Sequence, residues 1–520
     1  MTDAAAMSRA PAAVSHWFIA PLVAMAAFME VMDISVANVA LPHIAGALGA
    51  SQDESTWVLT SYLATNAISM PISGWLSNRF GRKRFFLACI AGFTVSSLLC
   101  GLAPNLVSLM VLRALQGAAG GGLQPMGQAI LADSFPPEKR GMATALYGIA
   151  AVVAPIVGPV LGGWITDSYD WRWIFLINVP IGIVLLSLIS SLLPESGADR
   201  AHAEGGGRVD GWGFAFIALA LGCLQIVLDR GQEDDWFASG SIAVLTVIAA
   251  LSLVLLVRHE LRRENPMIDL RMFASREFAV AFGMMAMLGF SMNASTFILP
   301  AYAQSLMGYS AMDAGLVIGP AGLALVVIMP IVGKLVNKVD LRVLIAIGLV
   351  SSGLATWWMT NFYLGISFKV MMLARVAQMA GVAFLFIPIN TIVFRSVPPT
   401  KTNNASALVN LARNFGGSIG LTVTSVLLTR RGQFHQSRIV EHLQSMNPAY
   451  PDFATQLGGL AGRAAGAPST LATLYQSAME QASLLSYLDT FKVLAWVFLA
   501  SLPLILLVKR GKGGAAVMAH

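Results

Sequence analysis

The chain has 520 residues, of which 56% are hydrophobic and only 12% are charged, and its formal net charge is +6. Soluble domains carry about 25% charged residues, so this composition excludes an ordinary soluble enzyme and indicates a protein that crosses a membrane many times. The three cysteines lie in apolar runs, and the seven histidines show no metal-ligand spacing. We therefore expect neither a disulfide framework nor a metal site.

The first apolar stretch, residues 17–39, is long enough to cross a bilayer. As a helix it would span roughly 34 Å, and a hydrocarbon core is about 30 Å thick. Glu30 and Asp33 lie near its middle, three positions apart and therefore on one helical face. Carboxylates at this depth are costly and usually functional. The alternative is a structural role in which polar neighbours satisfy both acids.

Apolar runs between charged or Gly- and Pro-rich breaks predict fourteen transmembrane helices. Lys and Arg gather in alternate loops, which the positive-inside rule places in the cytoplasm together with both termini. The predicted spans are residues 17–39, 56–77, 85–103, 106–131, 142–165, 173–193, 212–228, 237–257, 278–304, 314–336, 342–360, 369–393, 405–428 and 490–508.

Three sequence pairs recur at a nearly constant offset, which indicates a duplicated six-helix unit. Gly74 to Arg79 is echoed 259 positions later, and both Arg113 to Gln116 and Pro136-Pro137 are echoed 262 positions later. The expected fold is an all-α polytopic membrane protein with two six-helix bundles. Its expected parts are a tail of 1–16, a first bundle of 17–193, a linker with two inserted helices at 194–277, a second bundle of 278–508 that includes a partly helical extracytoplasmic segment of 429–489, and a tail of 509–520.

The loop after the second predicted span carries the basic run Gly74-Trp-Leu-Ser-Asn78-Arg79-Phe-Gly81-Arg82-Lys83-Arg84. This run resembles the loop motif G-x-L-x-D-R-x-G-R-K/R of the major facilitator superfamily, and the resemblance implies that superfamily's fold. The Asp of the motif is Asn78 in this chain. Glycines permit close helix approach and arginines can meet acids or helix ends, so a conformational latch is expected at Gly74, Asn78, Arg79, Gly81, Arg82 and Arg84. A basic turn that only sets topology is the alternative.

The fifth predicted span contains Ala154-Pro155-Ile-Val-Gly158-Pro159-Val-Leu-Gly162-Gly163. It is similar to the motif G-x-x-x-G-P-x-x-G-G of exporters in the superfamily, which implies that the direction of transport is export. Small residues four positions apart permit close packing, and Pro159 removes a helix hydrogen bond and is expected to bend the helix. Helix packing alone is the alternative.

The first span's run from Met32 to Pro42 resembles the signature of the fourteen-span drug:proton antiporters, and the stretches 57–62, 173–182, 224–231 and 235–237 add to the resemblance. Within this group the chain is similar to EmrB-type pumps of bacterial tripartite efflux systems. The resemblance implies a proton-coupled multidrug exporter in the bacterial inner membrane, driven by the proton gradient without a cofactor. It implies as partners the lipid bilayer, hydrophobic small molecules, protons, an EmrA-like periplasmic adaptor and an outer-membrane channel, and no nucleic acid.

Helix geometry places Asp33 about 24 Å from the cytoplasmic side and Arg113 about 10 Å from the opposite side. In a hydrocarbon core of about 30 Å these two depths nearly coincide. We expect Asp33 to carry the proton, Glu30 to assist it and Arg113 to tune it, with Arg375 and Arg413 as weaker alternative partners. The polar candidates for the substrate cavity are Asn38, Tyr62, Gln116, Gln124, Asn293 and Arg413.

Two other functions stay open from the residues alone. The first is a proton-coupled transporter of one natural metabolite, such as a fatty acid, siderophore, sugar or organic anion. The second is a membrane-embedded enzyme or receptor, although the chain lacks the clusters of His, Cys or acids that catalysis requires. The inserted helices carry no acid within 212–228 and 237–257, so we expect them to stay outside the proton step.

Overall fold

The computed structural model of the protein describes residues 16–193, 210–263, 266–442 and 468–511. These residues form an all-helical molecule, without a β-strand in the described ranges. Nearly all of both predicted tails, most of the linker at 194–209 and the central part of the long segment at 443–467 lie outside the described residues.

The helices follow one another along the chain with short connections. They are α1 (His16–Leu48), α2 (Gln52–Phe80), α3 (Arg82–Gly101), α4 (Leu106–Gly120), α5 (Leu123–Ser134), α6 (Pro137–Ser168), α7 (Trp173–Leu176), α8 (Asn178–Leu192), α10 (Gly211–Arg230), α11 (Gly240–Arg262), α12 (Arg276–Met307), α13 (Ala311–Leu335), α14 (Leu341–Met359), α15 (Phe368–Arg395), α16 (Thr402–His442) and α18 (Pro468–Ala500).

Each of the fourteen predicted spans lies on helix within the described chain. Eleven helical segments are long and apolar enough to cross a membrane, and α6 is a twelfth when its two arms, which meet at 41°, count as one span. The second and thirteenth predicted spans lie on α2 and α16, which carry more polar side chains. Several of these, such as Asn66 and Asn410, are buried against protein rather than lipid. Hydropathy therefore supports twelve spans, and the number fourteen stays a prediction.

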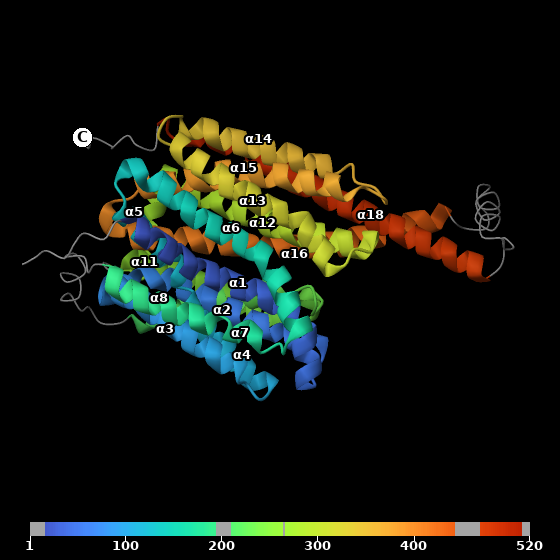
Figure 1. Ribbon diagram of the computed structural model, residues 1–520, viewed down its shortest axis with the longest axis horizontal. Helices are drawn as coiled ribbons and strands as arrows, with labels where there is room; N and C mark the ends of the chain where they lie inside the picture. Colours follow the sequence, from blue (N-terminus) through green and yellow to red (C-terminus); the bar gives the residue numbers. More distant parts are fainter. Residues whose placement is uncertain (1–15, 194–209, 264–265, 443–467, 512–520) are drawn as a thin grey trace, which may run out of the picture.

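Helices α1–α8, which we call the N half, and helices α12–α18, the C half, lie side by side in Figure 1. In the N half α1 packs along α6 and α2 along α4, and in the C half α12 packs along α16 and α14 along α15. The glycine-rich stretch at the end of α4 makes one of these contacts very close. A Cβ atom on Gly117 would lie 2.2 Å from the carbonyl oxygen of Tyr62, so glycine is needed where α4 crosses α2.

The halves contact each other along α6 and α13, and they also meet at one end of the molecule, which we call the basic end and define by the loops α2–α3, α5–α6, α13–α14 and α15–α16. A Cβ atom on Gly74 of α2 would meet the side chain and backbone of Asn404 of α16, and Asn403 Nδ2 donates to Asn78 Oδ1 at 2.7 Å. Deeper in the same interface, Asn410 Nδ2 donates to Gln128 Oε1 at 2.9 Å. The halves are therefore closed against each other at the basic end.

The inserted helix α10 packs on both halves, on α2 and on α16. Arg230 Nη1 donates to Thr56 Oγ1 of α2 at 2.6 Å, and Gln225 Nε2 donates to Ser418 Oγ of α16 at 2.9 Å. The same Gln225 amide donates to Asp229 at 2.9 Å. Asp229 lies one residue beyond the predicted span, which explains why that span contained no acid. The insert thus joins the two halves, and α11 packs mainly on α10.

Helices α16 and α18 project beyond the other helices at the end opposite the basic end (Figure 1). We call residues 429–442 and 468–489 the helical hairpin. The segment 429–489, which was predicted to be partly helical, is helical over 429–442 and 468–489. Asp489 connects its two arms by accepting from His435 Nε2 at 2.8 Å, while Lys492 Nζ lies 3.1 Å from its other oxygen.

Replacing Asn78 by Asp should strengthen closure at the basic end. The carboxylate would accept the hydrogen bond from Asn403 as a charged acceptor, which gains about 1 kcal/mol over a neutral one. In a protein whose native cysteines are replaced and which carries Ser406→Cys in this interface, we expect slower thiol labelling with Asn78→Asp. We expect faster labelling with Asn78→Leu, which removes the acceptor. Equal labelling rates in all three backgrounds would show that Asn78 is not part of a latch.

Candidate functional site

Asp33 of α1 and Arg113 of α4 form an ion pair inside the N half. Arg113 Nη1 lies 2.5 Å from Asp33 Oδ2, and the two residues are 0% and 2% exposed, respectively. The structure therefore brings together the two residues that the depth argument paired. The alternative partners point elsewhere, because Arg375 and Arg413 form their hydrogen bonds with other residues.

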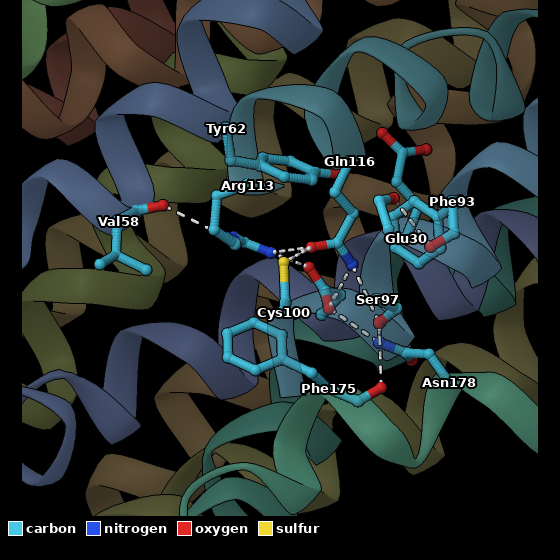
Figure 2. Close-up of polar contacts among 12 residues, drawn as sticks. Glu30, Val58, Tyr62, Phe93, Ser97, Cys100, Arg113, Gln116, Phe175 and Asn178 are labelled. Carbon is cyan, nitrogen blue, oxygen red and sulfur yellow. Dashed lines mark hydrogen bonds and ion pairs between the residues drawn. The ribbon is translucent and has the colours of Figure 1, made fainter. Parts of the chain in front are cut away.

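Two amides complete the surroundings of the Asp33 carboxylate. Asn178 Nδ2 donates to Asp33 Oδ1 at 2.8 Å, and Gln116 Nε2 donates to the same oxygen at 3.1 Å. Both amides also donate to Ser97 Oγ at 3.1 Å, and Ser97 in turn donates to the carbonyl oxygen of Phe175 (Figure 2). Helices α1, α3, α4 and α8 therefore converge on one carboxylate.

Arg113 has partners besides Asp33. Its Nε donates to the carbonyl oxygen of Val58 at 3.2 Å, and its Nη1 donates to Gln116 Oε1 at 2.8 Å. The guanidinium carbon lies 4.3 Å from the ring centroid of Tyr62 and 5.4 Å from that of Phe175 (Figure 2). Aromatic faces and carbonyl oxygens both attract a cation. The guanidinium therefore keeps favourable contacts even when the carboxylate is neutral.

Glu30, one turn from Asp33, has a separate set of neighbours. Its Oε1 accepts from Asn66 Nδ2 at 2.9 Å, while the buried Oε2 has no hydrogen-bond partner among the described residues. The charge of Arg413 from the C half acts on it, and Arg413 donates to Gln124 Oε1 of α5. Glu30 thus lies where the N half meets the C half, whereas Asp33 lies inside the N half.

The structure divides the predicted cavity residues into two groups. Tyr62, Gln116 and Gln124 are buried, and the first two belong to the Arg113 cluster instead of facing an open space. Asn38 and Asn293 are exposed, and Arg413 is half-buried. Only this second group has surface that a substrate can reach in this conformation.

The site also contains two residues to which the sequence assigned no role, Asn178 and Ser97. Asn178 is the first residue of α8 and lies within the stretch 173–182 that contributed to the resemblance. That stretch was the one signal for it in the sequence. Ser97 lies in an ordinary apolar run, and only the packing of α3 against α8 makes it a partner of the site.

The proline and glycine motif of α6 packs directly on the segment of α1 that follows Asp33. Pro159 cannot donate to the carbonyl of Pro155, four residues earlier. Instead Ser35 Oγ of α1 donates to that oxygen at 3.2 Å, and the helix bends by 41° between the arms that end at Pro155 and begin at Val157. A Cβ atom on Gly158 would lie 2.5 Å from the Cβ atom of Ser35.

The remaining two glycines of this motif differ in their surroundings. A Cβ atom on Gly162 would lie 3.1 Å from the carbonyl oxygen of Val36, whereas a Cβ atom on Gly163 would meet nothing within 4 Å. Close packing on α1 therefore requires glycine at position 158. It leaves little room for a side chain at 162, and it leaves room for one at 163.

The basic loop residues of the expected latch lie at the junction of α2 and α3. Gly81 has a φ of +84°, a conformation that glycine adopts readily and other residues rarely do. Arg82 forms an ion pair with Asp133 of α5, Arg79 lies over the ring of Trp75 at 5.4 Å, and Arg84 is exposed. Arg79 and Arg82 thus contact the N half, and Gly74 and Asn78 contact α16 of the C half.

Comparison with known proteins shows the family through a family model and through similar sequences, and the fold through a solved structure. The chain matches the family model of the Major Facilitator Superfamily over residues 23–421. It is 39% identical to the multidrug export protein EmrB of Haemophilus influenzae over 83% of this chain and 84% of that protein, and 36% identical to EmrB of Escherichia coli K12 over 95% and 96%. Its fold is similar to that of the proton:xylose symporter XylE, with a TM-score of 0.59 at 15% identity over 97% of this chain and 98% of that one.

The contacts of α6 with α1 provide a matched pair of variants. Gly158→Ala should push α6 away from α1 and reduce the unfolding temperature and the export activity, because its Cβ would overlap Ser35. Gly163→Ala adds the same atom to the same motif in open space and should change neither quantity. The expected destabilisation for Gly158→Ala is about 1–3 kcal/mol. Equal unfolding temperatures for the two variants would show that close packing on α1 is not what this motif provides.

Proposed function

The chain belongs to the major facilitator superfamily, and from this premise we propose that it exports hydrophobic and amphipathic toxic compounds in exchange for protons. It is a transporter and not an enzyme. Multidrug efflux is supported by relatives named multidrug export proteins, which are similar along 83% and 95% of the chain. Proton coupling and the residues that perform it are our proposal.

The single observation that carries the proton step is the buried Asp33–Arg113 pair. A carboxylate in an apolar bundle is tolerated as an ion only while a cation and hydrogen-bond donors surround it. A movement that draws Arg113 away leaves the neutral acid as the favourable form. Arg113 retains Val58, Gln116 and Tyr62 as partners, so proton uptake by Asp33 does not leave a buried guanidinium alone.

Helix α6 offers a route from Asp33 to the interface between the halves. Its motif contacts Ser35, two residues after Asp33, and the same helix packs on α13 of the C half. The described structure is closed at the basic end. A change in the Asp33 pair that shifts α1 therefore acts on a helix that also contacts the C half, which is what exchange between inward- and outward-open states requires.

Asp33→Asn should abolish substrate-induced proton release and make a pump-deficient host as sensitive to a panel of hydrophobic toxic compounds as cells without the protein. Arg113→Ala should lower coupled export by more than about tenfold, because breaking a buried pair costs about 3–5 kcal/mol.

The matched control is Arg172→Ala, which removes an arginine that donates to the carbonyl oxygen of Ala103 and does not contact Asp33. It should leave coupled export and substrate-induced proton release unchanged. Each variant is compared at equal amounts in the membrane. Unchanged export and proton release in Asp33→Asn would rule out this residue as the proton carrier.

We further propose that the protein lies in a bacterial inner membrane with both termini in the cytoplasm and assembles with a periplasmic adaptor and an outer-membrane channel. The resemblance to EmrB-type pumps supports this, and the helical hairpin offers a surface for the adaptor. Phe434, Val440 and Tyr475 of the hairpin are 44%, 41% and 58% exposed. These side chains gain little from a water-exposed position and suit a partner contact.

A photo-crosslinking amino acid at Gln476, which is exposed on the hairpin, should capture the adaptor in cells that contain one. The same probe at Trp496, which is exposed on α18 within the predicted span 490–508, serves as control and should give no adaptor adduct. Adducts that are absent at Gln476, or equally abundant at both positions, would contradict adaptor docking on the hairpin.

A further inference from the structure

Arg375 of α15 is a fully buried arginine that the proton step does not use. It is 1% exposed. Its Nη1 donates to Ser295 Oγ and to Gln378 Oε1, both at 2.7 Å, and its Nη2 donates to Thr296 Oγ1 at 2.6 Å. Its Nε is buried and has no partner among the described residues. All of these partners are neutral, so the guanidinium has no counter-charge.

The cluster around Arg375 repeats the cluster around Arg113. Arg375, Gln378 and Ser295 lie 262 positions after Arg113, Gln116 and Asp33, which is the offset of the duplicated unit. In both halves the arginine Nη1 donates to the glutamine and to the residue of α1 or α12, which is Asp33 in the N half and Ser295 in the C half. The glutamine amide then donates to a hydroxyl, Ser97 in the N half and Thr356 in the C half.

The two clusters differ in the other contacts of the arginine, since Arg113 Nε donates to Val58 and Arg375 Nε has no partner among the described residues, but the main difference is charge. The N half has the carboxylate of Asp33 where the C half has the hydroxyl of Ser295. A buried charge without a counter-charge costs several kcal/mol, so proteins normally place an opposite charge beside it or replace the residue. The C half has retained its arginine at this cost while lacking the acid. We infer that Arg375 binds the anionic group of amphipathic organic acids among the exported compounds, with that anion taking the place that Asp33 takes in the N half.

A route to the cluster runs along α12. Thr296, which accepts from Arg375, is half-buried, and next to it on the same helix Asn293 and Phe297 are exposed. Nε of Arg375 is the donor that has no partner, and a carboxylate is suited to the guanidinium because it can accept two hydrogen bonds from it. The expected ligand class is therefore an organic anion with an apolar tail, whose head group passes Thr296 when the halves separate.

This inference rests on the proposed export function and names one class of its substrates. Ser295→Asp tests it directly, because the new carboxylate would give Arg375 the partner that Arg113 has and would exclude a second anion. Ser295→Asn is the matched control of the same size without charge. Arg375→Gln removes the cation itself. The full-length protein is studied in nanodiscs of phosphatidylcholine, a lipid without net charge, so that no anionic lipid competes for the site.

The probes are octanoate and its neutral amide, octanamide, which share the apolar tail. The wild type and Ser295→Asn should bind octanoate at least about tenfold more tightly than octanamide, as expected for a desolvated charge-assisted pair. Ser295→Asp should lose this preference while keeping octanamide binding and its unfolding temperature. Arg375→Gln should lose the preference as well if it folds, and Ser295→Asp alone decides the question if it does not.

Three results overturn the inference: a wild type that does not prefer octanoate, a Ser295→Asp variant that keeps the preference, or a Ser295→Asn variant that loses it equally, which would show an effect of size.

These results are distinct from failure of the proposed function. A wild type that prefers octanoate but confers no proton-dependent resistance to any compound would retain the anion site and contradict export. A wild type that confers resistance but has no preference for octanoate would retain export and lose only the anion site.

Discussion

The burial of a charged pair inside an apolar helix bundle is the constraint on which the N half depends. Asp33 and Arg113 are almost wholly removed from solvent, and the effective cost of desolvation is several kcal/mol for each ion. Good geometry and hydrogen bonds to the carboxylate are needed to offset that cost, which explains why Gln116 and Asn178 donate to Asp33 and are themselves held by Ser97. The pair therefore determines how α1, α3, α4 and α8 must pack, and a proton on Asp33 changes the stability of that whole arrangement.

The two halves have kept the same polar framework and changed one group in it. With the acid present, the cluster in the N half holds a charge that a proton can cancel. Without it, the cluster in the C half holds a cation whose partner must come from outside the described chain. In the two proposals, one duplicated unit supplies a proton site in the N half and an anion site in the C half, and the two sites do not compete for the same atoms.

Long apolar runs and a constant offset were sufficient to predict the helices and the duplication, because burial in lipid leaves a strong periodic signal. The Asp33–Arg113 pair was predictable from depth alone. Other features depend on contacts between helices distant in sequence: Asn178 and Ser97 at the site, Tyr62 and Gln116 in the core instead of the cavity, and α10 between α2 and α16. The extent of the helical hairpin was not predicted either, because its helices carry many polar residues and project beyond the other helices (Figure 1).

The hydrogen bond from Ser35 to the carbonyl of Pro155 has a consequence for how this sequence can evolve. Pro159 is tolerated in α6 because the hydroxyl of Ser35 donates the hydrogen bond that the missing amide cannot donate. The serine is therefore needed only while the proline is present. Loss of Ser35 alone leaves the partly buried carbonyl of Pro155 without a donor, whereas with a residue other than proline at 159 the backbone amide can donate to that carbonyl and the serine is not needed. The two positions are therefore epistatic, and lineages that change one of them are expected to change the other.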